Sequence, residues 1–259
     1  MHTVSSLIDD LKRIGVKGGM ILIVHSSLKA IGEVCGGVSS VIIALEEVLG
    51  IEGTLAMPTH TCGLTDPAGW SSPPAPESDW EIIRAEMPPY EPDLTPTRKM
   101  GFLPETFRKQ NGTLRSTHPH LSWAARGKNA EYITSNHPLK MSSGDNSPLG
   151  RLYDLDAWIL LIGVGNVVNT SLHLAECRQK GIEDRMIKTG APILIGKQRQ
   201  WVEFEDIELD DKNFEEIGYE FEKKNEVIKG KIGEADSKLM RQGELVDFAA
   251  EWMREKNER

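Results

Sequence analysis

Cysteine is scarce in this chain of 259 residues, which contains Cys35, Cys62 and Cys177 and no others. Because the three are odd in number and far apart, they argue against a disulfide scaffold and against a C-x-x-C zinc site. We therefore expect three free thiols.

Long apolar segments are also lacking. No stretch approaches the roughly 18 uncharged apolar residues that a membrane span requires. The N-terminus, MHTVSSLIDDLKRIG, carries acids inside its apolar pattern and lacks the basic region and apolar core of a secretory signal. A hydrophobic content of 39% and a charged content of 27% are near the averages of soluble proteins. The sequence predicts a soluble, cytoplasmic protein with no membrane partner.

Positive charge is in deficit, since 30 Lys and Arg residues stand against 39 Asp and Glu residues and give a net charge of -9. This balance disfavours nucleic acid as a partner and mildly favours a cationic one, although we expect most of the acids to be solvated surface residues. We find no internal repeat and no low-complexity tract.

What the chain does contain is three short, continuous apolar runs, Met20–Val24, Thr54–Met57 and Ala157–Ile162. Such runs are typical of strands that are buried on both faces. Apolar residues at helical spacing lie between and around them, near residues 4–14 and 38–49. Strands that alternate with helices imply a largely parallel sheet. We therefore predict an α/β fold, a single α/β/α sandwich domain over residues 1–259.

The C-terminal third differs from the rest. Lys188–Ile195 and Gln200–Phe204 are predicted to form antiparallel strands joined near Gly196-Lys197, because a glycine-containing turn separates two strand-like runs. Helices are expected to start near Asn213 and near Gly243.

The segment at about 58–98 breaks the α/β pattern. Seven prolines fall between Pro73 and Pro96, with Trp70 just before them and Trp80 among them, which is too much proline for a continuous helix. A long loop in a compact domain is usually functional or disordered, and the aromatic residues weigh against disorder. We expect an ordered, lid-like excursion; a flexible linker is the alternative.

The stretch from Ser147 to Glu176 contains a predicted strand–turn–helix unit: the buried strand Ala157–Ile162, a glycine-rich turn, and a helix from Leu172 onward. His173 and Glu176 on that last helix are three residues apart, so they share a face near the carboxyl end of a strand, where open α/β sheets bind ligands. A histidine within hydrogen-bond reach of a carboxylate is a candidate general base with its orienting partner. The alternative is a surface histidine with an ordinary neighbour.

Two other loops carry polar side chains that suit an anion such as a phosphate. His25, Ser26, Ser27 and Leu28 follow the first predicted strand, and a second loop carries Arg115, Ser116 and His118 before Pro119, which fixes its shape. In the alternative interpretation the serines form turns and Arg115 pairs with a nearby acid.

Several long blocks resemble the aminoglycoside N3-acetyltransferase family of antibiotic-modifying enzymes: SPLGRLY, LLIGVG and NTSLHLAE between residues 147 and 176, PPAPESDWEIIR and MPPYEPDLTPT in the excursion, and the HSSL and RSTHP loops. The resemblance covers about residues 20 to 250. It implies an acetyl-coenzyme A-dependent transfer to the 3-amino group of an aminoglycoside, antibiotic resistance as the biological context, and no metal. It also implies that the two polar loops bind the cofactor, through His25, Ser26, Ser27, Leu28, Arg115, Ser116, His118 and Pro119.

Acetyl transfer to an amine needs a proton acceptor and donors for an oxyanion. Under the resemblance, His173 and Glu176 are the catalytic residues. The remaining candidates would contact the cationic acceptor or, for Thr170, the oxyanion; they are His60, Glu77, Asp79, Thr170 and Asp206. His60-Thr61-Cys62 and Val167-Val168 depart from the family pattern and leave the identity of the amine open.

Other functions stay open at this point. The acceptor could be a different amine-bearing small molecule. A metal-dependent hydrolase could use His118, His120 and His173, although this spacing is weak beside recurring ligand motifs. A non-catalytic module could keep the coenzyme A loops alone. The chain could also assemble as a homodimer.

Overall fold

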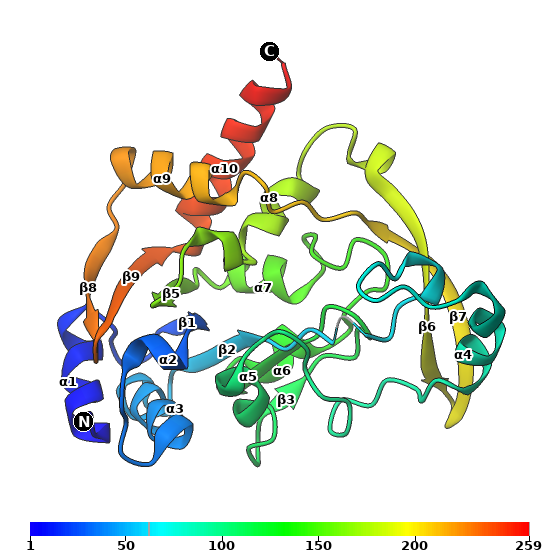
Figure 1. The fold of residues 1–259 in the computed structure, drawn as a ribbon. Helices are drawn as coiled ribbons and strands as arrows, with labels where there is room; N and C mark the ends of the chain where they lie inside the picture. The colour runs from blue at the N-terminus through cyan, green and yellow to red at the C-terminus, as the bar shows by residue number, and fades with distance from the viewer. Residues whose placement is uncertain (62, 259) are drawn as a thin grey trace.

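A seven-stranded sheet runs through the computed structural model, which describes residues 1–61 and 63–258 (Figure 1). The strand order is β3-β4-β2-β1-β5-β9-β8. Their bounds in that order are Leu114–Arg115, Trp123–Gly127, Thr54–Pro58, Ile21–Ser26, Trp158–Ile162, Ala235–Arg241 and Ile228–Ile232. The three apolar runs predicted as buried strands therefore lie side by side as β2, β1 and β5.

Parallel pairing is concentrated at the centre of the sheet. β1 pairs parallel with β2 on one side and with β5 on the other, whereas the outer strands pair antiparallel. At one flank β8 and β9 are joined by a two-residue turn after Ile232, and so tight a connection requires antiparallel strands. The predicted α/β fold with a parallel centre and antiparallel portion is confirmed.

Alternate residues of the central strands enter two separate cores, as expected for a sheet covered on both faces. Leu22 and Val24 of β1 pack into one core, while Ile23 packs into the other. The first core is covered by α1 (Val4–Arg13), α3 (Gly37–Leu49) and α5 (Phe102–Phe107). The second is covered by α6 (Ala130–Thr134), α7 (Pro148–Asp154), α8 (Leu172–Cys177), α9 (Phe214–Lys224) and α10 (Gln242–Asn257).

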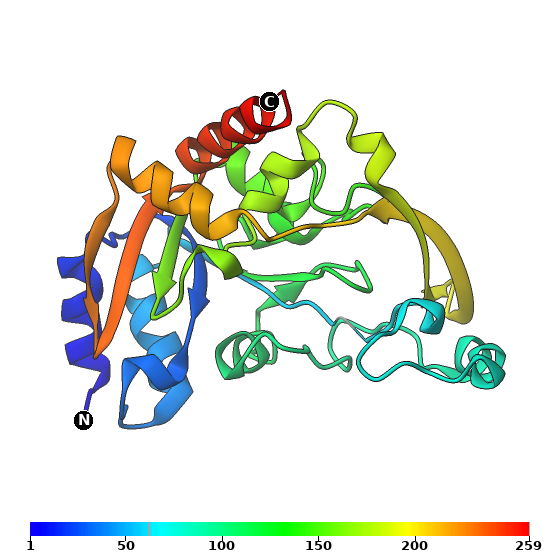
Figure 2. The ribbon, with the colours of Figure 1, turned by 45° about the horizontal axis from the view of Figure 1, so that its top comes forward.

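The predicted antiparallel pair forms a separate two-stranded sheet, β6 (Met186–Ile195) with β7 (Gln198–Ile207). In both ribbon views this hairpin stands away from the main sheet, beside α4 (Trp80–Glu86) (Figure 2). Arg199 Nε of β7 donates to the carbonyl oxygen of Met87 at 2.8 Å, which ties the hairpin to the excursion.

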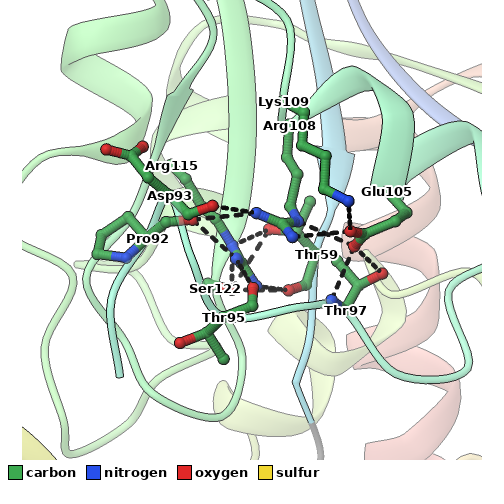
Figure 3. A network of polar contacts seen from close by, with 10 residues as sticks. All are labelled: Thr59, Pro92, Asp93, Thr95, Thr97, Glu105, Arg108, Lys109, Arg115 and Ser122. Atoms are coloured by element: carbon green, nitrogen blue, oxygen red, sulfur yellow. Dashed lines mark hydrogen bonds and ion pairs between the residues drawn. The ribbon is translucent and has the colours of Figure 1, made fainter. Parts of the chain in front are cut away.

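The excursion at about 58–98 carries short helices of its own, η1 (Pro67–Gly69), η2 (Glu77–Asp79) and α4. Two arginines fasten its C-terminal part to the main domain, Arg108 at the end of α5 and Arg115 in β3 (Figure 3). Arg108 donates to the carbonyl oxygen of Asp93 at 2.9 Å and pairs with Glu105 at 2.7 Å. Arg115 donates to the carbonyl oxygens of Pro92 and Thr95 at 2.9 and 2.5 Å.

Cys35 is exposed, Cys177 is buried, and both are free thiols as predicted. Cys62 lies outside the described residues. Across residues 1–61 and 63–258 we find no helix with the length and apolar character needed to cross a membrane.

Candidate active site

The carboxyl ends of the three parallel strands meet at one edge of the sheet and bring the predicted site residues together. Within the paired register His25 lies beside Leu161, and Ser26 lies beside Ile162, the last residue of β5. His60 follows the end of β2 by two residues. This edge is where open α/β sheets place their ligands.

The turn after β5 is shaped by Gly163, whose φ is +64°. A Cβ at this position would come within 2.3 Å of the Cβ of Ala30 in α2 (Leu28–Ile31), so no larger residue fits without displacing that helix. The backbone N–H of Ser27 donates to the carbonyl oxygen of Ile162 at 2.9 Å. The HSSL loop is thereby packed directly on the turn that leads to His173.

Ser27 of this loop is the N-cap of α2, because its Oγ accepts the backbone N–H of Ala30 at 3.3 Å.

His173 and Glu176 form a hydrogen-bonded pair on α8. The Nδ1 of His173 lies 2.5 Å from the Oε2 of Glu176, so a proton on Nδ1 is directed at the carboxylate and Nε2 is the nitrogen left to accept another proton. Leu172, Leu174 and Ala175 are fully buried and anchor the helix in the core. The His173 side chain is 15% exposed and its ring packs 4.7 Å from that of Phe214.

Glu176 is itself buried at 2% exposure and surrounded by donors. Its second oxygen, Oε1, accepts Nη1 of Arg185 at 3.1 Å and the backbone N–H of Asp210 at 3.1 Å. A buried carboxylate needs such partners, because isolated buried charge is strongly unfavourable. Its orientation is fixed on both sides.

Two further histidines at this edge are held neutral. Burial lowers the pKa of His25 to about 3, with a smaller contribution from the charge of His173. Burial likewise lowers the pKa of His60 to about 3, and the charge of His173 again makes the next largest contribution. His173 is the one member of this group that is hydrogen-bonded to a carboxylate.

Buried polar atoms beside the pair have no hydrogen-bond partner within the described parts of the chain. They are Nε2 of His25, Oγ1 of Thr170 and Oγ of Ser171. Buried polar atoms are normally paired, so unpaired ones next to a candidate base are suited to hold a ligand.

The second predicted cofactor loop lies at the same edge, since β3 and β2 end there. β3 is three strand positions from β1, roughly 14 Å at the usual strand spacing, so the two loops begin from well-separated strands. Arg115 is 8% exposed and all three of its guanidinium nitrogens donate to protein oxygens, including the carbonyl oxygen of Thr59 at 2.7 Å. Burial lowers its pKa.

Ser116 and His118 belong to a buried polar cluster at the base of the hairpin. Ser116 Oγ lies 2.9 Å from Nδ1 of His137, and Nδ1 of His118 accepts the N–H of Leu121 at 2.9 Å. Pro119 contributes its carbonyl oxygen, which accepts the hydroxyl of Thr61 at 2.5 Å. These side chains are held by the protein, and their contact with coenzyme A stays a prediction.

The predicted acceptor residues do not gather in one place. Asp206 is in the buried cluster, where it accepts the N–H of Ser142 at 3.0 Å and where burial raises its pKa. Glu77 and Asp79 are exposed on η2 in the excursion. His60 and Thr170 lie at the sheet edge, near His173.

The histidines of the rival metal hydrolase are not brought together. His118 packs on His120, with ring centroids 5.7 Å apart, and on His137, whereas His173 packs on Phe214. Among the described residues, no group of three His, Cys, Asp or Glu side chains is arranged to hold a metal ion.

Arg185 and the backbone of Asp210 are parts of the site that sequence reasoning missed. They lie nine and 34 positions after Glu176 and belong to no spacing that would reveal the contact. Only the folded chain places them on the carboxylate.

An imidazole oriented by a buried carboxylate, beside two neutral imidazoles and unpaired hydroxyls, is suited to remove a proton from a nucleophile. This geometry defines a candidate general-base enzyme at the carboxyl edge of an α/β sheet. Comparison with known proteins is more specific. Residues 23–254 match the family model described as aminoglycoside 3-N-acetyltransferase, and the chain belongs to that family.

One relative is the SPbeta prophage-derived aminoglycoside N(3')-acetyltransferase-like protein YokD of Bacillus subtilis (strain 168). It is 42% identical over 252 residues, which are 97% of this chain and 92% of the relative. The crystal structure of YokD superposes with a TM-score of 0.97 at 40% identity, covering 100% of this chain and 95% of that one.

Two other similar structures are complexes with ligands. AAC-IIIb in a binary complex with CoASH has a TM-score of 0.87 at 29% identity, and the match covers 98% of this chain and 97% of that one. AAC-VIa bound to sisomicin has a TM-score of 0.87 at 27% identity, and covers 98% of each chain.

Proposed function

We propose that this protein is an acetyl-coenzyme A-dependent N-acetyltransferase that acetylates the 3-amino group of an aminoglycoside, with His173 as the general base and Glu176 as its orienting residue. The observation that carries the proposal is the 2.5 Å contact between His173 Nδ1 and Glu176 Oε2 at the carboxyl edge of the sheet. It leaves Nε2 to receive a proton. Coenzyme A and aminoglycoside complexes of family members support the choice of substrates.

Acetyl-coenzyme A supplies an acetyl thioester, whose carbonyl carbon an amine attacks with release of the thiol. His173 Nε2 takes the proton that the amine nitrogen loses as the new C–N bond forms, and it can return that proton to the departing thiolate. Glu176 stabilises the positive charge that develops on the imidazole and holds the ring in place. His25 and His60 stay neutral and so do not repel the imidazolium.

The unpaired buried atoms beside His173 fit the proposed ligand. Thr170 Oγ1 and Ser171 Oγ are hydroxyls that could donate to a carbonyl oxygen on which negative charge develops. Backbone N–H groups of this segment are further candidates, although several already donate within it.

We propose that the HSSL loop, including His25, Ser26, Ser27 and Leu28, contacts the coenzyme A arm. Its support is the packing of this loop on the turn that leads to His173. For Arg115, Ser116, His118 and Pro119 the same role is a prediction, because the arginine and the two polar side chains already have protein partners.

Contacts to the acceptor from His60, Glu77, Asp79, Thr170 and Asp206 are predictions as well. A single domain over residues 1–259 and a cytoplasmic location are our further predictions for the chain. Antibiotic resistance is the context that the family suggests, and a homodimer is an assembly that the sequence leaves open.

A different amine-bearing acceptor is the second candidate, and one observation favours it. Val167 and Val168 are 49% and 45% exposed in η3 (Asn166–Val168), directly before Asn169 and Thr170. Exposed apolar side chains beside a site suit an acceptor with an apolar portion better than a fully polar, polycationic one.

The test is free-thiol release from acetyl-coenzyme A across an aminoglycoside panel and a set of simple amines, with the products identified by mass spectrometry and NMR. We expect turnover with at least one aminoglycoside and an acetyl group on its 3-amino nitrogen. Turnover with other amines alone would replace the aminoglycoside with the second candidate, and no turnover with any amine would contradict both.

A further inference from the structure

Glu176, the partner of the proposed base, is contacted by residues at both ends of the β6–β7 hairpin. Arg185 is the last residue of η4 (Ile182–Arg185), directly before β6, and Glu208 directly follows β7. The N–H of Glu208 donates to the carbonyl oxygen of Arg185 at 2.9 Å, and Nη2 of Arg185 donates back to the carbonyl oxygen of Glu208. These two bonds close the open end of the hairpin.

From this closed end, two donors reach the same carboxylate oxygen. Arg185 Nη1 and the backbone N–H of Asp210 each lie 3.1 Å from Oε1 of Glu176, on the side away from His173. The Glu176 side chain is 3% exposed, whereas the Arg185 side chain is 36% exposed. A nearly buried carboxylate is thus reached by one partly solvated cation.

We propose that Arg185 is a positioning residue for the reaction: it holds Glu176 in the orientation that directs His173 Nδ1, and it offsets the charge of the buried carboxylate. The inference rests on the proposed function, since it assigns Arg185 a task through the His173–Glu176 pair. Arg185 touches neither reactant and is not itself catalytic.

Without Arg185, Oε1 of Glu176 would keep a single neutral donor, the backbone N–H of Asp210. A buried carboxylate without its cation binds a proton more readily and can rotate about its side-chain bonds. In either case Oε2 no longer holds the Nδ1–H of His173 as a charged acceptor. The proton-accepting nitrogen is then less often in place, and the chemical step slows while substrate binding does not.

The experiment compares Arg185→Gln and Arg185→Lys in the full-length protein with the parent in the acetyl-transfer assay. We expect Arg185→Gln to lower kcat about tenfold or more, which corresponds to an increase of about 1.4 kcal/mol or more in the activation free energy. KM for acetyl-coenzyme A should stay within about twofold of the parental value. The pH profile of kcat should change as well, because the charge of the buried carboxylate is no longer offset. Arg185→Lys keeps the cation, so it should recover part of kcat and the parental pH profile.

Arg241→Gln is the matched control. Arg241 has a nearly equal side-chain exposure of 38% and is also paired with a carboxylate, that of Asp156. It lies opposite Trp158, at the end of β5 away from the site. Its loss should leave kcat and the pH profile unchanged.

A readout independent of turnover is the NMR signal of the His173 Nδ1–H proton in protein labelled with ¹⁵N-histidine. We expect it to shift or broaden in Arg185→Gln and to be preserved in Arg185→Lys and Arg241→Gln. If Arg185→Gln does not fold, Arg185→Met takes its place, because it also removes the cation and keeps an unbranched side chain. A parental kcat together with an unchanged Nδ1–H signal in the folded variant that lacks the cation would overturn the positioning role.

His173→Ala, measured alongside, separates this inference from the proposed function. If His173→Ala is inactive and Arg185→Gln is normal, the positioning role alone is wrong. If His173→Ala keeps the parental rate, the general-base assignment fails first.

Discussion

At the scale of single residues, the site shows how surroundings give one residue type different tasks. His25 and His60 are buried without a carboxylate partner, and their pKa values fall to about 3. His173 lies at the same edge but is joined to Glu176. Of the three imidazoles, it alone has a partner that stabilises the charge which a general base acquires.

Glu176→Gln tests that partnership. The amide keeps the shape of the side chain but removes its charge, so the imidazolium formed during transfer loses stabilisation. We expect kcat to fall, but by less than the about 10²–10⁴-fold that removal of a general base typically costs. Steady-state kinetics on folded protein would check this. A Glu176→Gln variant with the parental kcat and reduced thermal stability would mean that the pair merely supports the helix.

Arg115 was predicted to bind the cofactor, and in the structure its guanidinium is hydrogen-bonded to protein oxygens. It fastens residues 92 and 95 of the excursion to the sheet through its buried guanidinium. Arg115→Lys should lower the free energy of unfolding by about 2–3 kcal/mol, because three donors on one nitrogen cannot replace a planar fork and buried oxygens are left unpaired. Urea unfolding measures this effect.

The same variant tests the cofactor prediction for Arg115. Calorimetric titration of the folded Arg115→Lys and Arg115→Ala proteins with coenzyme A should show weaker binding if the guanidinium contacts a phosphate. Unchanged affinity in both would remove Arg115 from the cofactor site and leave it a structural residue.

At the scale of elements, the sequence predicted best those strands that are buried on both faces. β1, β2 and β5 read as continuous apolar runs because helices cover both sides of them. β8 (IKGKI) contains two lysines and β9 (ADSKLMR) contains the polar run Asp236-Ser237-Lys238, so neither reads as a continuous apolar run, and neither was predicted. Their strand character depends on pairing with each other and with β5, which no local pattern reports.

The sequence predicted only the part of the candidate site that depends on local spacing. His173 and Glu176 could be paired from their spacing, because three residues on a helix fix a common face. Arg185 could not, since it reaches Glu176 through a 3₁₀ turn and the closed end of a hairpin. Local periodicity carries no information about that long-range contact.

Gly163→Ala tests the close packing of α2 on the turn after β5. Its φ of +64° disfavours any side chain, and the new Cβ would lie 2.3 Å from Ala30. We expect a loss of about 2–4 kcal/mol of stability from backbone strain and overpacking together, with reduced affinity for acetyl-coenzyme A. Denaturant titration and calorimetry would measure the two effects.

Gly50→Ala is the control, because Gly50 has the same φ of +64° but nothing within 4 Å of a Cβ. It should cost about 1–3 kcal/mol, from backbone strain without overpacking. Equal losses in the two variants would contradict the account of the Gly163 contact.

At the scale of the whole molecule, five buried histidines make stability depend on pH. The lowered pKa values are about 3 for His25, about 3 for His60 and about 4 for His137, in each case mainly through burial. Burial also lowers the pKa values of His118 and His120. All five rings are therefore neutral in the folded protein at pH values where an unfolded histidine is protonated.

The sign of the effect follows from proton binding. Between about pH 6.5 and the folded pKa values, the unfolded chain binds more protons, so the free energy of unfolding decreases as pH falls. Burial of His25, His60 and His137 as neutral rings should lower the free energy of unfolding by about 2 kcal/mol each at about pH 5. Asp206 offsets a small part of this loss of stability at lower pH, because burial raises its pKa and the folded state then binds its proton more readily.

Thermal unfolding at about pH 7.5, 6 and 5 is the check, and Tm should fall steeply below about pH 6.5. The calorimetric experiment can also count the protons taken up on unfolding. A Tm that is flat over this range, with no proton uptake, would contradict the burial of neutral imidazoles.

The account depends above all on His173 as the general base, and the most direct test is the kcat of folded His173→Ala with its best amine acceptor. We predict a fall of about 10²–10⁴-fold while acetyl-coenzyme A still binds with parental affinity, because the proton acceptor is lost and the cofactor contacts are not. A folded His173→Ala protein that keeps more than about a tenth of the parental kcat would contradict the assignment, since that rate exceeds what loss of the base permits.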